Sequence, residues 1–95
     1  MEQVIDRWGN RITLTDERLQ HIIEWHPELE TFEADVLETI RKGRRRQDPI
    51  DPQKYKYVYP VEGLPFGLTH IVVVVRITAR KFVLTAYGIE KKGGR

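Results

Sequence analysis

The chain of 95 residues contains no cysteine. Without thiols it has no disulfide framework, no cysteine nucleophile and no cysteine-bound zinc, a composition typical of proteins in a reducing cytoplasm. Long apolar runs are also lacking: the longest, residues 71–75, has five residues, whereas a membrane-spanning helix needs about 20. The first residues do not show the basic segment and apolar run of a signal peptide. We therefore expect a cytoplasmic protein that does not span a membrane.

The length predicts a single domain over residues 1–95, with a basic tail at 88–95. A domain of this size has one core, so a site must lie on its surface or in a shallow cleft and not in a deep cofactor tunnel. We expect no cofactor. Charged residues make up 32% of the chain and hydrophobic ones 40%, which is ordinary for a globular protein and excludes wholesale disorder.

Charge is distributed unevenly along the chain. Residues 1–40 hold ten acidic and three basic residues, a balance of −7, and residues 41–95 hold four acidic and thirteen basic residues, a balance of +9. A basic half favours a polyanionic partner, and an acidic half favours solubility or a basic partner. The alternative is that both charge runs are simply solvated faces.

Turn residues and hydrophobic periodicity predict the elements of the first half of the chain. Residues 8–10 form a turn between two short strands at 3–7 and 11–14. A helix capped by Thr15 then runs to residue 25, where Pro27 ends it. A second helix covers residues 33–42, with Gly43 as its left-handed C-cap.

Strands dominate the second half. A loop containing a short strand covers residues 44–52, and three further strands are predicted at 54–59, 68–78 and 81–87. The alternating tyrosines at 55, 57 and 59 place three rings on one face. We predict an α+β fold in which an N-terminal hairpin and two helices precede an antiparallel sheet of three or four strands, with the helices on one face.

Two histidines on the first helix are candidate functional residues. His26 continues the apolar stripe of that helix, so it is either a half-buried structural histidine or an acid-base group at the margin of a cleft. His21 lies on the opposite side next to Trp25, either as a surface residue or as part of a base-stacking platform. The two are roughly 140° apart around the helix, which does not suit a metal pair, and we expect no metal site.

A second group of candidate site residues depends on the register in which the last two strands pair. With Ala79 and Arg80 in a two-residue turn, Arg76 faces Val83, Thr85 faces Val74 and Tyr87 faces Val72, and the polar residues of one face are His70, Arg76, Thr85 and Tyr87. A three-residue loop would instead put Arg76 on the face of Phe82 and Leu84. We favour the first register. Such polar groups are costly under a helix unless they line a polar site; the alternative is that Arg76 lies at an edge and Tyr87 in the core.

Basic segments supply candidate RNA contacts. Arg44, Arg45 and Arg46 follow the second helix, and Lys91 and Lys92 lie near the C-terminus. Such clusters bind phosphates regardless of sequence, because binding releases counterions. Tyr57 could stack on a base, although a tyrosine in a strand is more often part of the packing.

Several short motifs occur in an order that resembles a known family. These are His21-Ile22-Ile23, His26-Pro27-Glu28-Leu29, the strand 55–59, the strand 72–76, Thr85-Ala86-Tyr87 and Lys91-Lys92-Gly93. Together they resemble small phage and prokaryotic domains of the barnase, EndoU, colicin and RelE-like nuclease superfamily. The resemblance covers nearly the whole chain and implies a metal-independent ribonuclease with a four-stranded antiparallel sheet, acting as a toxin or a processing enzyme. It maps the histidine-proline-glutamate motif to His26, the strand cation to Arg76 and the threonine-alanine-tyrosine motif to Thr85 and Tyr87.

The sequence thus predicts cleavage of RNA by attack of the 2′-hydroxyl on the neighbouring phosphorus. In this hypothesis His26 is the acid or base with His21 in reserve, Arg76 binds phosphate, and Thr85 and Tyr87 donate hydrogen bonds or stack. One alternative is a non-catalytic RNA-binding module that uses the same basic face. Another is a protein-interaction domain that uses the acidic helices. If the protein is a toxin, an antitoxin or immunity protein is a further expected partner.

Overall fold

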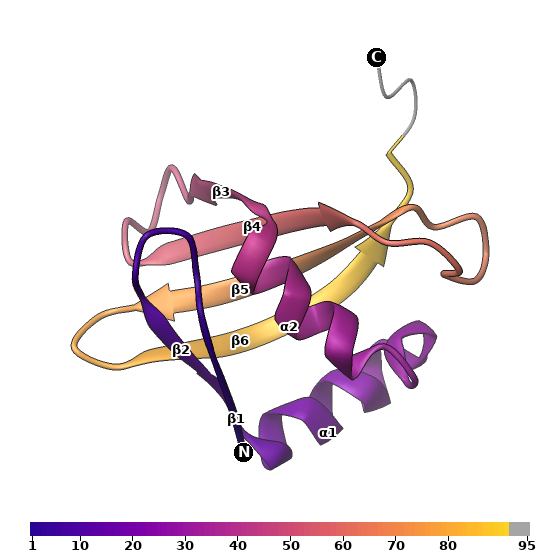
Figure 1. Cartoon of the computed structure of the whole chain (residues 1–95), viewed down its shortest axis with the longest axis horizontal. Coiled ribbons are helices and arrows are strands. Elements are labelled where there is room, and N and C mark those ends of the chain that lie inside the picture. Colours follow the sequence, from indigo (N-terminus) through magenta and orange to yellow (C-terminus); the bar gives the residue numbers. More distant parts are fainter. Residues whose placement is uncertain (92–95) are drawn as a thin grey trace.

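The computed structural model of the chain describes residues 1–91. Its fold is α+β: a hairpin and two helices precede the longer strands of a six-stranded mixed sheet, ordered β1-β2-β6-β5-β4-β3 (Figure 1). The elements are β1 (Glu2–Ile5), β2 (Arg11–Leu14), α1 (Asp16–Trp25), the 3-10 turn η1 (Pro27–Leu29), α2 (Glu33–Lys42), β3 (Arg44–Gln47), β4 (Lys54–Pro60), β5 (His70–Ile77) and β6 (Lys81–Ile89). The predicted N-terminal hairpin and both helices are confirmed.

The sheet is larger than the sequence predicted, and it is not purely antiparallel. The N-terminal hairpin joins it through β2, which runs parallel to β6 and pairs with it at Thr13 and Phe82. This docking buries Ile12 and Leu14 in the core. At the other edge β3 pairs with β4. The prediction of three or four antiparallel strands was wrong because it left the hairpin outside the sheet.

Local signals set the helix limits. The Thr15 hydroxyl accepts a hydrogen bond from the backbone N–H of Arg18, which caps α1. The helix ends at Trp25, before the His26-Pro27 pair. The left-handed cap predicted for Gly43 is wrong, because its backbone is extended with φ −71° and ψ 161°. Glycine is needed there for a different reason: a Cβ would lie 2.3 Å from the carbonyl oxygen of Thr39 and 2.9 Å from that of Val58.

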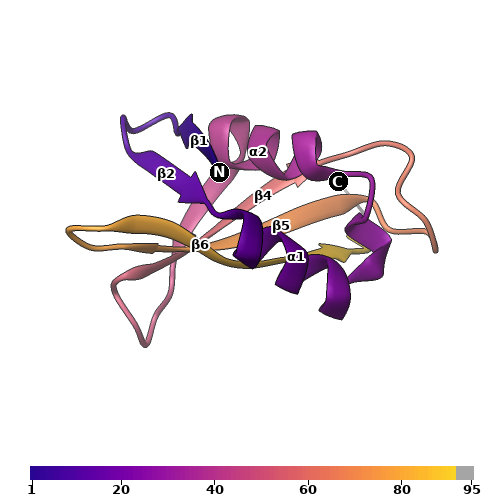
Figure 2. The same cartoon turned by 90° about the horizontal axis from the view of Figure 1, so that it is seen from below.

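One face of the sheet carries the main core. Helix α2 packs across β4 and β5, and α1 packs along β6 beyond the end of β2 (Figures 1 and 2). Val36 and Ile40 of α2, Ile22 of α1, and Val73 and Val75 of the central strand belong to one buried hydrophobic cluster. The three tyrosines at 55, 57 and 59 point to this side, as their alternation predicted, and Tyr57 is fully buried.

The β5–β6 hairpin combines the two registers considered from sequence. Next to the turn, Ile77 pairs with Lys81 and Arg76 with Phe82, so the loop has three residues and the predicted pairing of Arg76 with Val83 was wrong. A β-bulge between Val74 and Val75 then shifts the register, and Thr85 and Tyr87 meet their predicted partners Val74 and Val72. Because the bulge adds one residue to β6, it keeps Arg76, Thr85 and Tyr87 on one face. The strand also continues to Ile89, into the stretch predicted as a tail.

A buried carboxylate fixes the N-terminal hairpin to the sheet. Asp6 Oδ1 accepts the backbone N–H groups of Trp8 and Asn10, at 2.9 and 2.8 Å, and Oδ2 accepts the Asn10 side-chain amide and the Tyr57 hydroxyl. Arg45 Nη1 lies 3.6 Å from Oδ2. Burial alone would raise the pKa of Asp6, but these hydrogen bonds outweigh it and hold that pKa below its ordinary value. Burial, together with the bond to Asp6, raises the pKa of the Tyr57 hydroxyl.

No helix in the described part of the chain has both the length and the apolar character needed to cross a membrane.

Candidate nucleic-acid interface

Helix α2 covers one face of the sheet, and α1 lies along β6 at the edge of the sheet (Figure 2). Tyr57, Val73 and Ala86 point into the main core, so their neighbours in β4, β5 and β6 point to the opposite face. Strand pairing carries the same face across the sheet, with Arg46, Lys56, Val74 and Thr85 in one row and Arg44, Val58, Val72 and Tyr87 in the next. We call this surface the open face.

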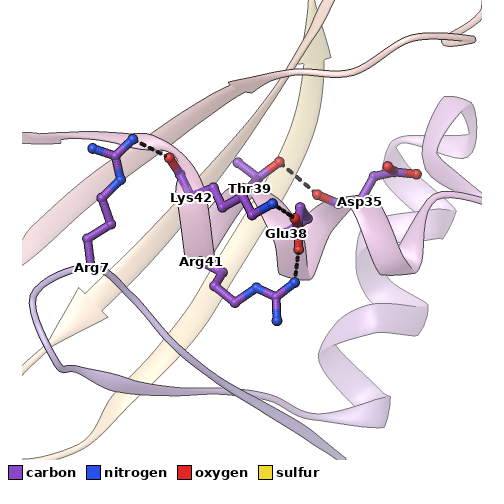
Figure 3. Close-up of polar contacts among 6 residues, drawn as sticks. All are labelled: Arg7, Asp35, Glu38, Thr39, Arg41 and Lys42. Carbon is purple, nitrogen blue, oxygen red and sulfur yellow. Dashed lines mark hydrogen bonds and ion pairs between the residues drawn. The ribbon is translucent and has the colours of Figure 1, made fainter.

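Cations border one side of an aliphatic strip on the open face. Val72 and Val74, which are buried by their neighbours, lie in the middle, and Arg44, Arg46 and Lys56 are exposed on the β3–β4 side. Among the described residues these three cations have no ion pair. Arg41 and Lys42, which precede them in the sequence, both pair with Glu38 at the end of α2, and the Lys42 carbonyl oxygen accepts a hydrogen bond from Arg7 (Figure 3). The basic cluster is thus divided into a locally neutralised part and a part open to a polyanion.

Two predicted RNA contacts point to the helix side, Arg45 half-buried and Tyr57 buried. The Arg45 guanidinium lies between the rings of Trp8 and Tyr55, at 4.1 and 4.6 Å from their centroids, beside Asp6. Tyr57 is 0% exposed. Both side chains therefore lie on the side of the sheet away from the open face, and their contact with RNA stays a prediction. The alternation of β3 and β4 sends both residues to the core side.

His26 lies beside Tyr87 at the edge of β6. The two ring centroids are 5.8 Å apart, and His26 Nδ1 is 3.6 Å from Glu28 Oε2. Glu28 also accepts a hydrogen bond from the backbone N–H of Gly88, at 3.3 Å, where β2 no longer covers the edge of β6. The exposed fraction is 34% for the His26 side chain and 16% for that of Glu28. A histidine and a carboxylate therefore meet at a site that solvent reaches.

A second histidine lies on the strand next to Tyr87. His70 pairs with Ile89 and points to the open face, two residues from Val72, the partner of Tyr87. Its Nδ1 is 2.7 Å from the Thr69 hydroxyl, which also accepts the backbone N–H of Lys91. Burial, and secondarily the charge of Lys91, lower the pKa of His70. Both effects favour the neutral form of the imidazole.

Arg76 lies at the opposite end of the same face. It lies four positions along β5 from Val72, which corresponds to about 13 Å. Its guanidinium is 3.4 Å from Asp51 and donates to the side chain of Gln53 at 3.3 Å. Thr85 lies between the two ends, opposite Val74. The fold thus joins His26 with Tyr87, but it does not bring Arg76 to them.

The remaining predicted residues lie elsewhere. The ring of His21 is 6.4 Å from that of Trp25, and both residues are exposed on α1. Lys91 is held near His70 by its backbone. Lys92 lies outside the described residues. His21 therefore takes no part in the cluster around Tyr87.

The sequence did not single out Phe66, which lines a pocket of about 430 Å3 beside Glu28. Phe66 is 87% exposed, and its φ of 62° is in the left-handed region, which is strained for a residue with a side chain. Such strain is concentrated at binding sites. The signal available in the sequence was an aromatic residue between Pro65 and Gly67 in a loop.

Within residues 1–91 no three histidine, aspartate or glutamate side chains form a group that could hold a metal ion. Compared with known protein families, curated proteins and solved structures, the chain matches none of them. The chemistry of the open face and of the cluster around Tyr87 is therefore the basis for a functional assignment.

Proposed function

We propose that this protein is a ribonuclease that cleaves RNA by transesterification, without requiring a metal ion. The observation that carries the proposal is the end of the open face, where His26 lies beside Tyr87 and Glu28, and where His70 lies on the neighbouring strand, two residues from the partner of Tyr87. Arg44, Arg46 and Lys56, which have no ion pair among the described residues, lie on the β3–β4 side of the same face. The order of motifs along the chain, which resembles the barnase, EndoU, colicin and RelE-like nucleases, agrees with this assignment.

Two histidines suffice for the chemistry. A neutral imidazole removes the proton of the ribose 2′-hydroxyl, the 2′-oxygen attacks the adjacent phosphorus, and a protonated imidazole donates its proton to the departing 5′-oxygen. The products are a 2′,3′-cyclic phosphate and a free 5′-hydroxyl. His70 suits the role of base because burial favours its neutral form. His26 suits the role of acid because the Glu28 carboxylate would form an ion pair with its protonated ring.

The other side chains have supporting roles in this proposal. Tyr87 is positioned to donate a hydrogen bond to the scissile phosphate or to stack against a base. Lys91 would add positive charge where negative charge develops on the phosphorane. Thr85 and Arg76, further along the face, would bind neighbouring phosphates. This departs from the sequence-based hypothesis, in which Arg76 contacts the reacting phosphate.

The test is cleavage of end-labelled, single-stranded and structured RNAs in excess EDTA, with the product ends analysed. We expect cyclic phosphate ends from the wild type and a loss of at least about 100-fold in rate for His26→Ala and for His70→Ala. His21→Ala is the matched control, because it removes an exposed imidazole of the same helix that lies outside the cluster. Equal cleavage by all three variants would show that this cluster does not carry the reaction.

A non-catalytic RNA-binding protein is the second candidate. The observation that favours it is the position of Arg76, which is paired with Asp51 and far from His26. It predicts RNA binding that weakens steeply with salt and no new RNA ends. A protein partner on the acidic helices, or an inhibitor that covers the open face, would be a separate interaction. A competition experiment with RNA distinguishes these two protein partners. Only an inhibitor bound to the open face would displace the RNA.

A further inference from the structure

A cleft of about 590 Å3 lies where β2 leaves the sheet, next to the tip of the β5–β6 hairpin. Strands β2 and β6 pair at one position, Thr13 with Phe82, so little backbone hydrogen bonding closes the sheet here. Ile12 and Leu14 point into the core; Arg11 and Thr13 therefore point to the opposite side, toward the cleft. The cleft is distinct from the cluster around Tyr87, with which it shares no lining residue.

The lining of the cleft is strongly basic. Arg11 and Arg18 contribute from the N-terminal half of the chain, and Arg80 and Lys81 from the hairpin. Within residues 1–91 none of these four side chains has an ion pair. The N-terminal ammonium group also lies here, but Asp16 holds it at 2.8 Å. Four like charges around one cleft repel one another, and a bound anion relieves this repulsion.

The other lining groups suit a nucleic-acid strand. Thr13 and Thr15 supply hydroxyl groups, and the Phe82 ring supplies an apolar surface. Phe82 pairs with Arg76 on the neighbouring strand, so the cleft continues the open face beyond Arg76. Along β6, Phe82 and Tyr87 are five residues apart, or about 16 Å. A strand bound at both places would span several nucleotides.

We propose that this cleft binds phosphate groups of the RNA strand whose cleavage occurs at the cluster around Tyr87. This inference rests on the proposed function and adds a substrate requirement to it. The protein prefers RNA long enough to reach from Tyr87 past Arg76 to Arg11 and Arg80. The cleft then determines affinity for long substrates and leaves the chemical step on short ones unchanged.

The test compares two double variants that each remove two positive charges. Arg11→Gln with Arg80→Gln changes the cleft, and Arg41→Gln with Lys42→Gln is the matched control, at the end of α2 (Figure 3). Binding of a fluorescent dinucleotide analogue and of a long single-stranded RNA is measured over a range of salt concentrations. Arg11 and Arg80 are exposed, so the double variant should keep the fold, and thermal melting tests whether it does. If the double variant does not fold, Lys81→Gln alone replaces it.

For the long RNA we expect the cleft variant to bind at least tenfold more weakly than the control. The slope of log affinity against log salt should become shallower by about 0.7 for each phosphate that the variant no longer neutralises. Binding of the dinucleotide and its rate of cleavage should not change. An equal weakening for both double variants would overturn the proposal, because total charge would then account for it.

A further measurement distinguishes failure of the cleft assignment from failure of the proposed ribonuclease function. If the wild type cleaves RNA but the cleft variant behaves like the control, only the cleft assignment fails. Pyrophosphate alone is titrated while backbone amide signals of residues 79–83 are followed by NMR. If pyrophosphate shifts them and the wild type neither binds nor cleaves RNA, the cleft binds a free phosphate compound, and both assignments are overturned.

Discussion

Replacing Asp6 by alanine should destabilise this fold more than any exposed substitution. The Asp6 carboxylate accepts hydrogen bonds from two backbone N–H groups, the Asn10 amide and the Tyr57 hydroxyl, and it lies beside Arg45. The Asp6 side chain has no exposed surface. Alanine would leave the Tyr57 hydroxyl and the Arg45 charge without their acceptor.

The expected loss is about 3–5 kcal/mol, the usual cost of removing one member of a buried ionic pair. A domain of this kind has a free energy of unfolding of about 5–15 kcal/mol, so the loss is a large part of the total. Each kcal/mol lowers the melting temperature of a domain of this size by about 4–8 °C, and we expect a fall of at least about 12 °C.

Urea denaturation followed by circular dichroism measures this loss. Tyr57→Phe removes one hydrogen bond and keeps the ring, so it should cost less, about 1.5–3 kcal/mol. Asp16→Ala is the surface control, because its carboxylate pairs with the N-terminal ammonium group in solvent. A loss below about 1 kcal/mol for Asp6→Ala would refute the conclusion that this carboxylate fixes the hairpin to the sheet.

The same carboxylate predicts how stability depends on pH. The pKa of Asp6 in the folded protein lies below the ordinary value of 3.8. An acid with a lowered pKa contributes stability that is present above the unfolded value and is lost as the pH falls through the folded value. We expect stability to decrease below about pH 4 in the wild type. The part of that decrease due to Asp6 should be missing in Asp6→Asn.

Three further changes test the local structure and the proposed function. Gly43→Ala should cost about 1–3 kcal/mol in urea denaturation, because its Cβ would meet two backbone carbonyl oxygens; unchanged stability would contradict this close approach. Thr15→Ala removes the cap of α1 and should cost about 1 kcal/mol in the same assay, and a neutral result would show that the cap does not matter. Asp51→Asn frees Arg76 on the open face, so RNA should bind a few-fold more tightly with a steeper salt dependence in fluorescence anisotropy; weaker binding would remove Arg76 from the interface.

Local physics accounts for what the sequence predicted correctly. A capping threonine and a proline after His26 determine where α1 begins and ends, since each acts on backbone groups within one turn. The alternation of Tyr55, Tyr57 and Tyr59 predicted a shared face, because successive residues of any strand point to opposite sides. The strand predicted over residues 68–78 contains β5, which pairs with β4 and β6.

Errors arose where the outcome depended on partners far away in the chain. The parallel pairing of β2 with β6 joins residues 13 and 82, and no local pattern encodes such a contact. The bulge in the last hairpin depends on how β6 packs as well as on its turn, so neither simple register was complete. Arg45 belongs to a run of three arginines, yet strand alternation sends it to the core side, where Asp6 pairs with it.

In the candidate site, too, some features followed from the local sequence and others depended on distant parts of the chain. The residue types were evident in the sequence: histidine beside proline and glutamate, a threonine-alanine-tyrosine strand and unevenly distributed cations. By itself the sequence determined the helix limits, the strand faces and the excess of positive charge in the second half, because these follow from neighbouring residues and from composition. The tertiary structure alone decided that His70 lies two residues from the partner of Tyr87, that Arg76 lies at the other end of that strand, and that Arg11 and Arg80 share a cleft. Those relations depend on which strands pair with each other. Packing of the whole chain selects that pairing, and local propensity does not.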